Sequence, residues 1–318
     1  MNGLPEDIAQ LGGATMGTTW SARLVVPRQR DLHALHAGIQ AQLDGVVAQM
    51  STWEAASDIS RYNRAAAGQW CRLPQPMRSV LHCAQAIADA SAGAFDPTVG
   101  PLVALWGFGA HAGPRRWPDA QVLAATRARC GFRRLQWDRE ALLQPGGLEL
   151  DLSAIAKGFG VDETVRWLRR QGVRAALVDV GGELRGYGRK PDGQPWRVLV
   201  ESTPDDDAGM PAPRVLALDD CAVATSGDRW HRYTHEGIEL SHSLDPRTGQ
   251  PVARAAAAVT VVAAEAMQAD AWATALTVLG SEAGMALATR RQLAVRFLQR
   301  GGSGPRELFS PAFQALLP

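Results

Sequence analysis

Two oxygen-bearing side chains, Asp270 and Thr274, lie four residues apart in the segment QADAWATALTVLG. The spacing of apolar residues there predicts a helix from Glu265 to Leu279 that ends at Gly280. On such a helix the two side chains share one face at a separation of roughly 6 Å, so both could bind one cation. Mg²⁺ prefers oxygen ligands, needs few of them from the protein, and completes its octahedron with water and substrate phosphates. The alternative is a structural pair, in which Asp270 favours the helix dipole and Thr274 packs.

A second candidate site lies between Leu148 and Gly188, where the sequence predicts a strand, a tight turn, a helix and another strand. The turn from Ser153 to Gly160 would open the helix, and unpaired N–H groups at a helix N-terminus bind anions such as phosphate. Lys157 would add a full positive charge, and the glycine pair 181–182 would let a ligand approach the backbone closely. If these glycines only make turns, the stretch is an ordinary strand–helix–strand unit.

Three further residues carry side chains that suit a binding site. His242 ends a predicted strand and could deprotonate a hydroxyl or bind a phosphate. Asp96, in the glycine-rich segment AFDPTVGPLVALWGFG, is expected to cap backbone groups or to hold a ligand hydroxyl. Trp53 lies in a polar loop, where its ring could stack on a planar ligand or cover the end of the preceding helix.

Predicted strands and helices follow one another without a linker long enough to separate independent domains. We therefore expect one α+β domain over residues 14–318, preceded by an N-terminal extension over residues 1–13. Residues 94–109 are expected to be irregular, and residues 221–229 to lead into a hairpin. The predicted strands cover 14–26, 148–152, 175–180, 196–201, 214–218, 230–235, 238–244, 257–263 and 293–298. The predicted helices cover 31–50, 76–92, 119–130, 265–279 and 284–291, in addition to the one that follows the 153–160 turn.

Composition and motifs exclude several classes of function. The 318 residues include 33 Lys and Arg against 32 Asp and Glu, so no overall charge would attract nucleic acid. No apolar run is long enough to span a membrane, and the four cysteines form no CxxC pair. Neither a GxGxxG nor a GxxxxGK[ST] motif occurs. Because the N-terminus has no signal-peptide pattern, we expect a cytoplasmic protein as given, and a periplasmic one if the N-terminus has been trimmed.

Eight sequence motifs, taken in order, resemble the ApbE family of FAD:protein FMN transferases. They are ATMGTTW, MSTW with SDISRYN, AFDPTVGPLVALWGFG, DLSAIAKGFGVD, VDVGGELRGYG, ATSGD, SHSLDPRTGQP and DAWATAL, and they extend from about Thr15 to Gly280. The resemblance implies an α+β fold related to the T-fold, with mixed sheets and flanking helices in two closely joined lobes. It also implies an FAD site in a cleft, a Mg²⁺ ion or in its place Mn²⁺, and an acceptor protein. FMN would be transferred to a Thr or Ser hydroxyl of that acceptor, with release of AMP.

The resemblance also assigns roles to individual residues. The carbonyl of Ala156 and the side chains of Asp270 and Thr274 correspond to the metal ligands of the family. Lys157 would add to the positive field around the pyrophosphate during catalysis, and His242 is the candidate general base. Ser243 stands where members often carry an apolar residue. The residues that resemble FAD contacts are Met16, Trp53, Ala94, Phe95, Asp96, Ser153, Lys157 and Leu244.

Two other functions remain compatible with the same motifs. In an FAD pyrophosphatase, water would replace the acceptor hydroxyl at the same metal, and FMN and AMP would be the products. A non-catalytic flavin-binding or flavin-delivery protein would need no metal, so the pair formed by Asp270 and Thr274 argues against it.

Overall fold

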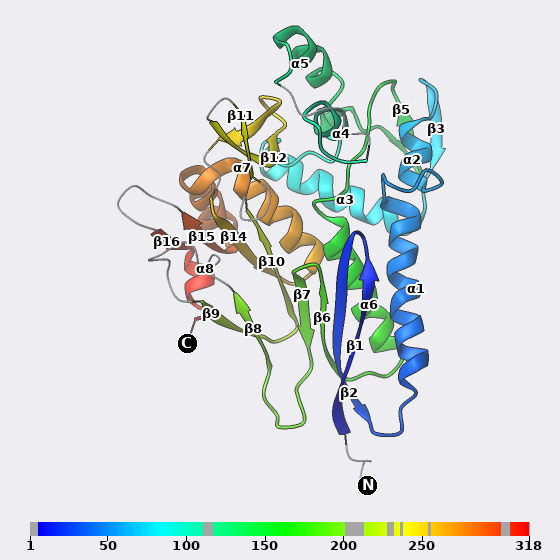
Figure 1. The fold of residues 1–318 in the computed structure, drawn as a ribbon, viewed down its shortest axis with the longest axis vertical. Coiled ribbons are helices and arrows are strands. Elements are labelled where there is room, and N and C mark those ends of the chain that lie inside the picture. The colour runs from blue at the N-terminus through cyan, green and yellow to red at the C-terminus, as the bar shows by residue number, and fades with distance from the viewer. Residues whose placement is uncertain are drawn as a thin grey trace.

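An eight-stranded antiparallel sheet forms the framework of the fold (Figure 1). The structure is a computed structural model that describes residues 6–110, 117–200, 213–227, 232–235, 238–253, 256–299 and 306–317. Neighbouring strands of this sheet pair antiparallel throughout. In spatial order the strands are β1 (Glu6–Thr15), β2 (Thr18–Pro27), β6 (Ala175–Val180), β7 (Glu183–Tyr187), β10 (Cys221–Ser226), β14 (Ala258–Ala263), β15 (Ala294–Gln299) and β16 (Arg306–Phe309).

Three smaller sheets lie around this framework. One contains β3 (Gln69–Arg72), β5 (Ala141–Gln144) and β4 (Trp137–Asp138), and another contains β11 (Arg232–His235), β12 (Ile238–Asp245) and β13 (Gln250–Ala253). The third is the pair β8 (Trp196–Val200) and β9 (Arg214–Leu218).

Several of the described helices begin behind a residue whose side chain caps the first turn. In α1 (Leu32–Met50), the Asp31 carboxylate accepts the backbone N–H of Ala34, and Leu35, Ile39 and Leu43 are buried along one face. None of the described helices is both long and apolar enough to cross a bilayer. The others are α2 (Asp58–Asn63), α3 (Gln75–Ala90), α4 (Gly100–Leu105), α5 (Ala120–Arg127), a 3₁₀ turn at Phe132–Arg134, α6 (Ala156–Arg170), α7 (Ala266–Arg291) and α8 (Pro311–Gln314).

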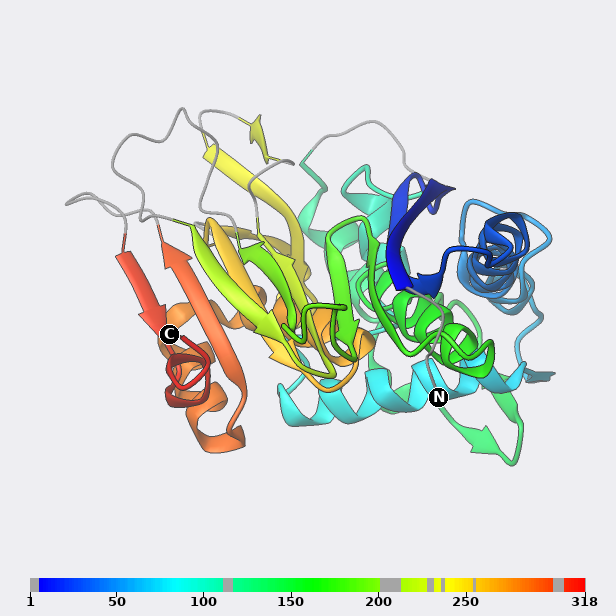
Figure 2. The same cartoon turned by 90° about the horizontal axis from the view of Figure 1, so that it is seen from below.

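The large sheet is covered on both faces. On one face, α1 and α6 pack against β2 and β6 through residues such as Leu24 and Val161. Figure 2 shows α3 and α6 together on one side of the strands. On the opposite face β8, β9 and α8 bury Leu177, Trp196 and Phe313. The central strands are therefore apolar on both sides, which removes the alternating pattern by which a half-exposed strand is recognised in a sequence.

The first turns of α6 and α7 are in direct contact. A Cβ atom on Gly158 would lie 2.3 Å from the carbonyl oxygen of Ala266, so only glycine permits this approach. The fully buried Asp162 of α6 accepts the backbone N–H groups of Ala266 and Met267, each at 3.0 Å, and thereby caps α7. This contact places Asp270, one turn into α7, against the first turn of α6.

The structure confirms the α+β fold class and most predicted helices. It also contains the expected break at Gly280, which has a φ of 75° and interrupts the helical geometry of α7. The segment expected to be irregular contains the short helix α4.

Two predicted segments were wrong, and one strand was missed. Residues 6–13 are not an extension, because β1 pairs with β2 along its whole length. Residues 148–152 form no strand ladder; only Glu149 makes an isolated bridge, and the Asn63 side chain bonds both the N–H and the carbonyl of Leu150 in place of a partner strand. The hairpin expected after residues 221–229 is present as β11 and β12. Residues 221–226, for which no strand was predicted, form the central strand β10, where Ala222 and Val223 are buried on opposite faces.

Candidate functional site

A cavity of about 440 Å³ opens between the first turns of α6 and α7, the start of β7 and the segment 94–103. Its size is that of a small-molecule site. The lining residues are Ala94, Phe95, Asp96, Val99, Val103, Asp151, Ser153, Ala154, Lys157, Gly181, Glu183, Thr225, Ser226, Gly227, Ser243, Leu244, Pro246, Asp270 and Thr274.

Most of the residues predicted for the site line this one cavity, although they come from distant parts of the sequence. The contact between α6 and α7 brings Lys157 and Asp270 together, and β12 delivers Leu244 to the opposite wall. The predicted site residues in the lining are Ala94, Phe95, Asp96, Ser153, Lys157, Leu244, Asp270 and Thr274.

Among the predicted residues whose side chains are described, three do not line the cavity. Ala156, the first residue of α6, is buried and directly precedes the lining residue Lys157 in the sequence. Met16 occupies the tight turn between β1 and β2, and its Cε lies 3.1 Å from where a Cβ on Gly160 would stand. Trp53 is 73% exposed, so its ring does not pack in the core. His242 belongs to β12, but its side chain lies outside the described part of the chain.

The predicted metal pair contains one buried carboxylate and one hydroxyl. Asp270 is 3% exposed, and its Oδ2 accepts the backbone N–H of Gly158 at 3.2 Å. Burial raises the pKa of Asp270 above its usual range, although Lys157 and the Gly158 N–H act in the opposite direction. The Thr274 Oγ1 lies 3.2 Å from the hydroxyl of Ser226. A carboxylate held in this environment would be stabilised by a bound cation.

These donors fit a hard cation that keeps much of its coordination shell. Asp270 and Thr274 both present oxygen to the cavity. Within the described ranges, no three His, Cys, Asp or Glu side chains are grouped closely enough to hold a metal by themselves. A Mg²⁺ ion here would therefore need a backbone carbonyl, such as that of Ala156, together with water and substrate oxygens, which is how this ion is commonly bound.

Lys157 is the positively charged side chain among the residues that line the cavity. Its Nζ donates to Glu183 Oε1 at 2.5 Å, and Glu183 is 4% exposed. Burial disfavours the charged ammonium, but Asp270, Glu183 and Asp179 outweigh this effect and raise the pKa of Lys157. Lys157 therefore stays protonated at neutral pH. At Gly181, where φ is 60°, a Cβ would lie 2.8 Å from Thr18 Cγ2, so this wall requires glycine.

Asp96 holds the loop that forms another wall. Its Oδ1 accepts the backbone N–H and the hydroxyl of Thr98, at 2.8 and 2.6 Å, and its Oδ2 accepts the N–H of Phe132 at 3.0 Å. Burial nevertheless raises the pKa of Asp96. Of the two roles expected for this residue, capping of backbone groups is the one that the contacts show.

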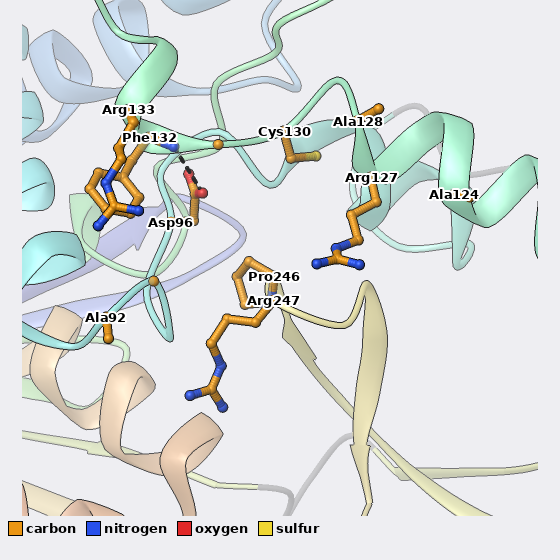
Figure 3. Close-up of a pocket in the computed structure, with 12 residues that line it drawn as sticks. Ala92, Asp96, Ala124, Arg127, Ala128, Cys130, Phe132, Arg133, Pro246 and Arg247 are labelled. Carbon is orange, nitrogen blue, oxygen red and sulfur yellow. Dashed lines mark hydrogen bonds between the residues drawn. The ribbon is translucent and has the colours of Figure 1, made fainter.

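A second cavity, of about 590 Å³, shares Asp96 and Pro246 with the first (Figure 3). The side chains of Arg127, Arg133 and Arg247 line it. Arg247 pairs with Asp245, whereas Arg127 and Arg133 make no ion pair with any described residue. The positive charge of this neighbouring cavity favours the approach of an anionic ligand to the whole region.

Sequence reasoning missed several polar residues of the first cavity, among them Asp151, Ser226 and Glu183. Asp151 Oδ1 accepts the N–H and the hydroxyl of Ser153, at 2.8 and 2.5 Å, and so shapes the turn that enters α6. Ser226 contacts Thr274, and Glu183 contacts Lys157. Of these three, only Glu183 could have been suspected from the sequence, because it directly follows the glycine pair 181–182, where a ligand was expected to approach the backbone closely.

Comparisons with known proteins agree with this geometry. A sequence model of the ApbE family matches residues 16–297. Proteins named FAD:protein FMN transferase from Klebsiella pneumoniae and Vibrio cholerae are each 36% identical to this chain, over 312 and 315 residues. These alignments cover 96% and 98% of this chain and 89% and 94% of the relatives.

Solved structures show the same similarity in three dimensions. The apo form of Pseudomonas stutzeri flavinyl transferase ApbE superimposes with a TM-score of 0.92 at 36% identity, over 100% of this chain and 99% of that one. Flavin transferase ApbE from Vibrio cholerae gives a TM-score of 0.90 at 35% identity, over 98% of this chain and 100% of that one. The predicted fold and the predicted resemblance are thus confirmed, and the chain belongs to the ApbE family.

Proposed function

We propose that this chain transfers the FMN moiety of FAD to a serine or threonine hydroxyl of an acceptor protein, with Mg²⁺ as cofactor and AMP as the leaving group. The observation that carries the proposal is the convergence of Asp270, Thr274 and Lys157 on one cavity beside the N-terminus of α6. The names of the similar proteins, FAD:protein FMN transferase and flavinyl transferase, support the same reaction.

The charges around the cavity suit a pyrophosphate only when a cation is bound. Lys157 and the N-terminus of α6, which has no side-chain cap, attract phosphate oxygens. Asp270 and Glu183 place two carboxyl groups in the same wall and would repel them. A divalent cation held by Asp270, Thr274 and the Ala156 carbonyl would neutralise this repulsion and withdraw charge from the reacting phosphoryl group.

The rest of the wall suits the planar rings of FAD. Phe95, Val99 and Val103 give the segment that precedes and includes α4 an apolar surface facing the cavity. Rings bind to such surfaces, while a few polar groups fix their orientation. The cavity therefore offers an apolar part for a ring system next to a charged part for the phosphates.

Transfer of a phosphoryl group is mainly a matter of positioning and of neutralising charge. Lys157, fixed by its bond to Glu183, would hold the pyrophosphate while a hydroxyl attacks in line. His242 remains the base suggested by the family resemblance.

The proposal is tested by incubating the protein with FAD, Mg²⁺ and an acceptor domain that carries a surface threonine. We expect AMP in the supernatant and an FMN-sized mass increase on the acceptor, with chelator abolishing both. An acceptor in which that threonine is replaced by valine is the matched control and should stay unmodified. AMP and free FMN without a modified acceptor would identify a pyrophosphatase. FAD binding without AMP formation would identify a binding protein.

A further inference from the structure

The cavity of about 590 Å³ carries positive charge that the described residues around it do not fully offset. Arg127, Arg133 and Arg247 line it, and Figure 3 shows their side chains arranged around Pro246. Asp245 binds Arg247 through both of its oxygens, which lie 2.9 and 2.8 Å from Nε and Nη2. Arg127 and Arg133 have no acidic partner in the part of the chain that the structure describes. Their two guanidinium groups are therefore available to bind an anion.

Both of these arginines are exposed at their charged ends and packed against neighbouring residues. The guanidinium carbon of Arg133 lies 5.1 Å from the centroid of the Phe132 ring. Phe132 is itself buried, and its N–H donates to Asp96. Arg127 ends α5, and its Cδ lies 3.6 Å from where a Cβ on Gly249 would stand. A guanidinium group that is already held in place loses less conformational freedom when it binds a ligand.

This cavity lies beside the one in which FAD is proposed to bind. The two cavities share Asp96 and Pro246. Even when Asp96 and Asp245 are both counted against the three arginines, one positive charge remains in excess. A ligand in the first cavity would leave this second cavity open at its side. The excess charge therefore acts on any molecule that approaches a bound FAD.

The proposed reaction indicates which molecule this is. The negative charge of FAD lies on its two phosphates, for which the first cavity already offers Lys157 and the N-terminus of α6. The acceptor protein must place the surface around its hydroxyl over the first cavity, and such a surface extends over the neighbouring one. Since Arg127 and Arg133 are exposed, side chains of a protein surface can reach them. Carboxylates are the anionic groups that such a surface carries, and guanidinium groups bind them in bidentate pairs.

We propose that the cavity lined by Arg127 and Arg133 is a docking surface for the acceptor protein, and that it binds Asp or Glu carboxylates close to the target hydroxyl. The inference rests on the proposed function and adds to it the kind of acceptor surface that the protein selects. Exposed charges of this kind act mainly on the rate of association and on the choice between partners, and salt screens them. A hydroxyl in a neutral or basic surface would therefore be a poorer substrate.

The test uses two acceptor domains that carry the same surface threonine. They differ only in whether the neighbouring side chains are Asp and Glu or the amides Asn and Gln. The variant of interest combines Arg127→Gln with Arg133→Gln. The matched control combines Arg23→Gln with Arg197→Gln, which removes two exposed arginines from β2 and β8 that line neither cavity. Both double variants change the net charge by the same amount.

The Kd of each acceptor is measured at low salt in the presence of FAD and Mg²⁺, with the target threonine replaced by valine so that no transfer occurs. We expect the wild-type protein to bind the acidic acceptor about tenfold more tightly than the amide acceptor. The variant of Arg127 and Arg133 should bind both acceptors with the weaker affinity, while its Kd for FAD stays within about twofold of wild type. The control should behave like wild type. In about 1 M salt, where the Debye length is about 3 Å, the preference should disappear.

Three results would overturn the docking surface. One is equal affinity of the wild-type protein for the two acceptors. Another is an equal loss in the control variant, which would reduce the effect to overall charge. The third is weaker FAD binding by the variant of Arg127 and Arg133 with no change in acceptor affinity, which would assign these arginines to FAD. Transfer to the threonine acceptors is measured separately, so a preference for the acidic acceptor without AMP formation would support the docking surface and contradict the proposed function.

Discussion

Replacing Glu183 by glutamine should stabilise the ligand-free protein. The carboxylate is 4% exposed, and one of its oxygens has no hydrogen-bond partner among the described residues. Burial, followed by repulsion from Asp270, raises the pKa of Glu183 from 4.5 to about 8. At neutral pH the folded protein therefore keeps Glu183 mostly protonated, whereas the unfolded chain would hold it ionised.

The sign and size of this effect follow from proton linkage. Between pH 4.5 and about 8 the folded state binds more protons at Glu183 than the unfolded state, so the free energy of unfolding falls as pH rises. The destabilisation caused by Glu183 is absent below pH 4.5 and reaches its full size above about pH 8. Since one pKa unit corresponds to about 1.4 kcal/mol, the penalty at pH 7 is at most about 3 kcal/mol. We expect Glu183→Gln to recover about 1–3 kcal/mol at that pH and almost nothing at pH 4.5.

Urea unfolding of the metal-free protein at several pH values between 4.5 and 8.5 measures this gain. Glu140→Gln is the control of opposite sign, because hydrogen bonds from Arg72 and the charges of Arg78 and Arg72 lower the pKa of Glu140. That variant should show no gain that grows with pH. A Glu183→Gln variant that is less stable than wild type at neutral pH, or whose gain does not change with pH, would refute the electrostatic reasoning.

Three further predictions concern the metal pair, the exposed indole and the contact between α6 and α7. In single-turnover assays, Asp270→Ala should lower the rate of FMN transfer by about a hundredfold or more. Thr274→Val should show a smaller defect that excess Mg²⁺ relieves. Full metal-dependent transfer by Asp270→Ala would show that this pair does not bind the metal. Trp53→Ala should weaken FAD binding by about 1–3 kcal/mol in calorimetry without changing Tm, since the side chain is 73% exposed, and an unchanged Kd would show that the indole does not stack on FAD. Gly158→Ala should destabilise the fold by about 1–3 kcal/mol or more, because its Cβ would meet the α7 backbone at 2.3 Å. Gly45→Ala is the matched control, because no atom lies within 4 Å of where its Cβ would stand, and it should stabilise α1 by about 0.5–1 kcal/mol. Equal changes in Tm for Gly158→Ala and Gly45→Ala would contradict the close contact between α6 and α7.

Local patterns in the sequence predicted those parts of the fold that depend on local physics. The apolar stripe of α1 and the helix-breaking Gly280 are visible without any knowledge of tertiary structure. The errors occurred where distant contacts decide. The strand β10 is buried on both faces and lacks alternation, and the alternating segment 148–152 is buried without a neighbouring strand because the Asn63 amide bonds its backbone.

The same distinction applies to the candidate site. The four-residue spacing of Asp270 and Thr274 placed both on one cavity wall, as expected for a single helix face. The role of Asp96 could be limited to two possibilities but not decided, since its partner Phe132 lies 36 residues away. Glu183 could not be assigned a role, because its importance comes from its contact with Lys157, which only the folded chain creates.

Three buried carboxylates lie near the α6–α7 contact, and they differ in how fully the protein supplies their hydrogen-bond partners. Asp162 is fully buried, accepts the N–H groups that begin α7 and pairs with Arg185 at 2.6 Å, so the protein supplies its partners. Asp270 receives one backbone N–H, and Glu183 keeps an oxygen without a partner, while burial raises the pKa of both. A fold that can satisfy Asp162 so fully has no structural need for two underbonded carboxylates nearby. The cost of these two carboxylates to stability is understandable if a cation that arrives with the substrates offsets their negative charge.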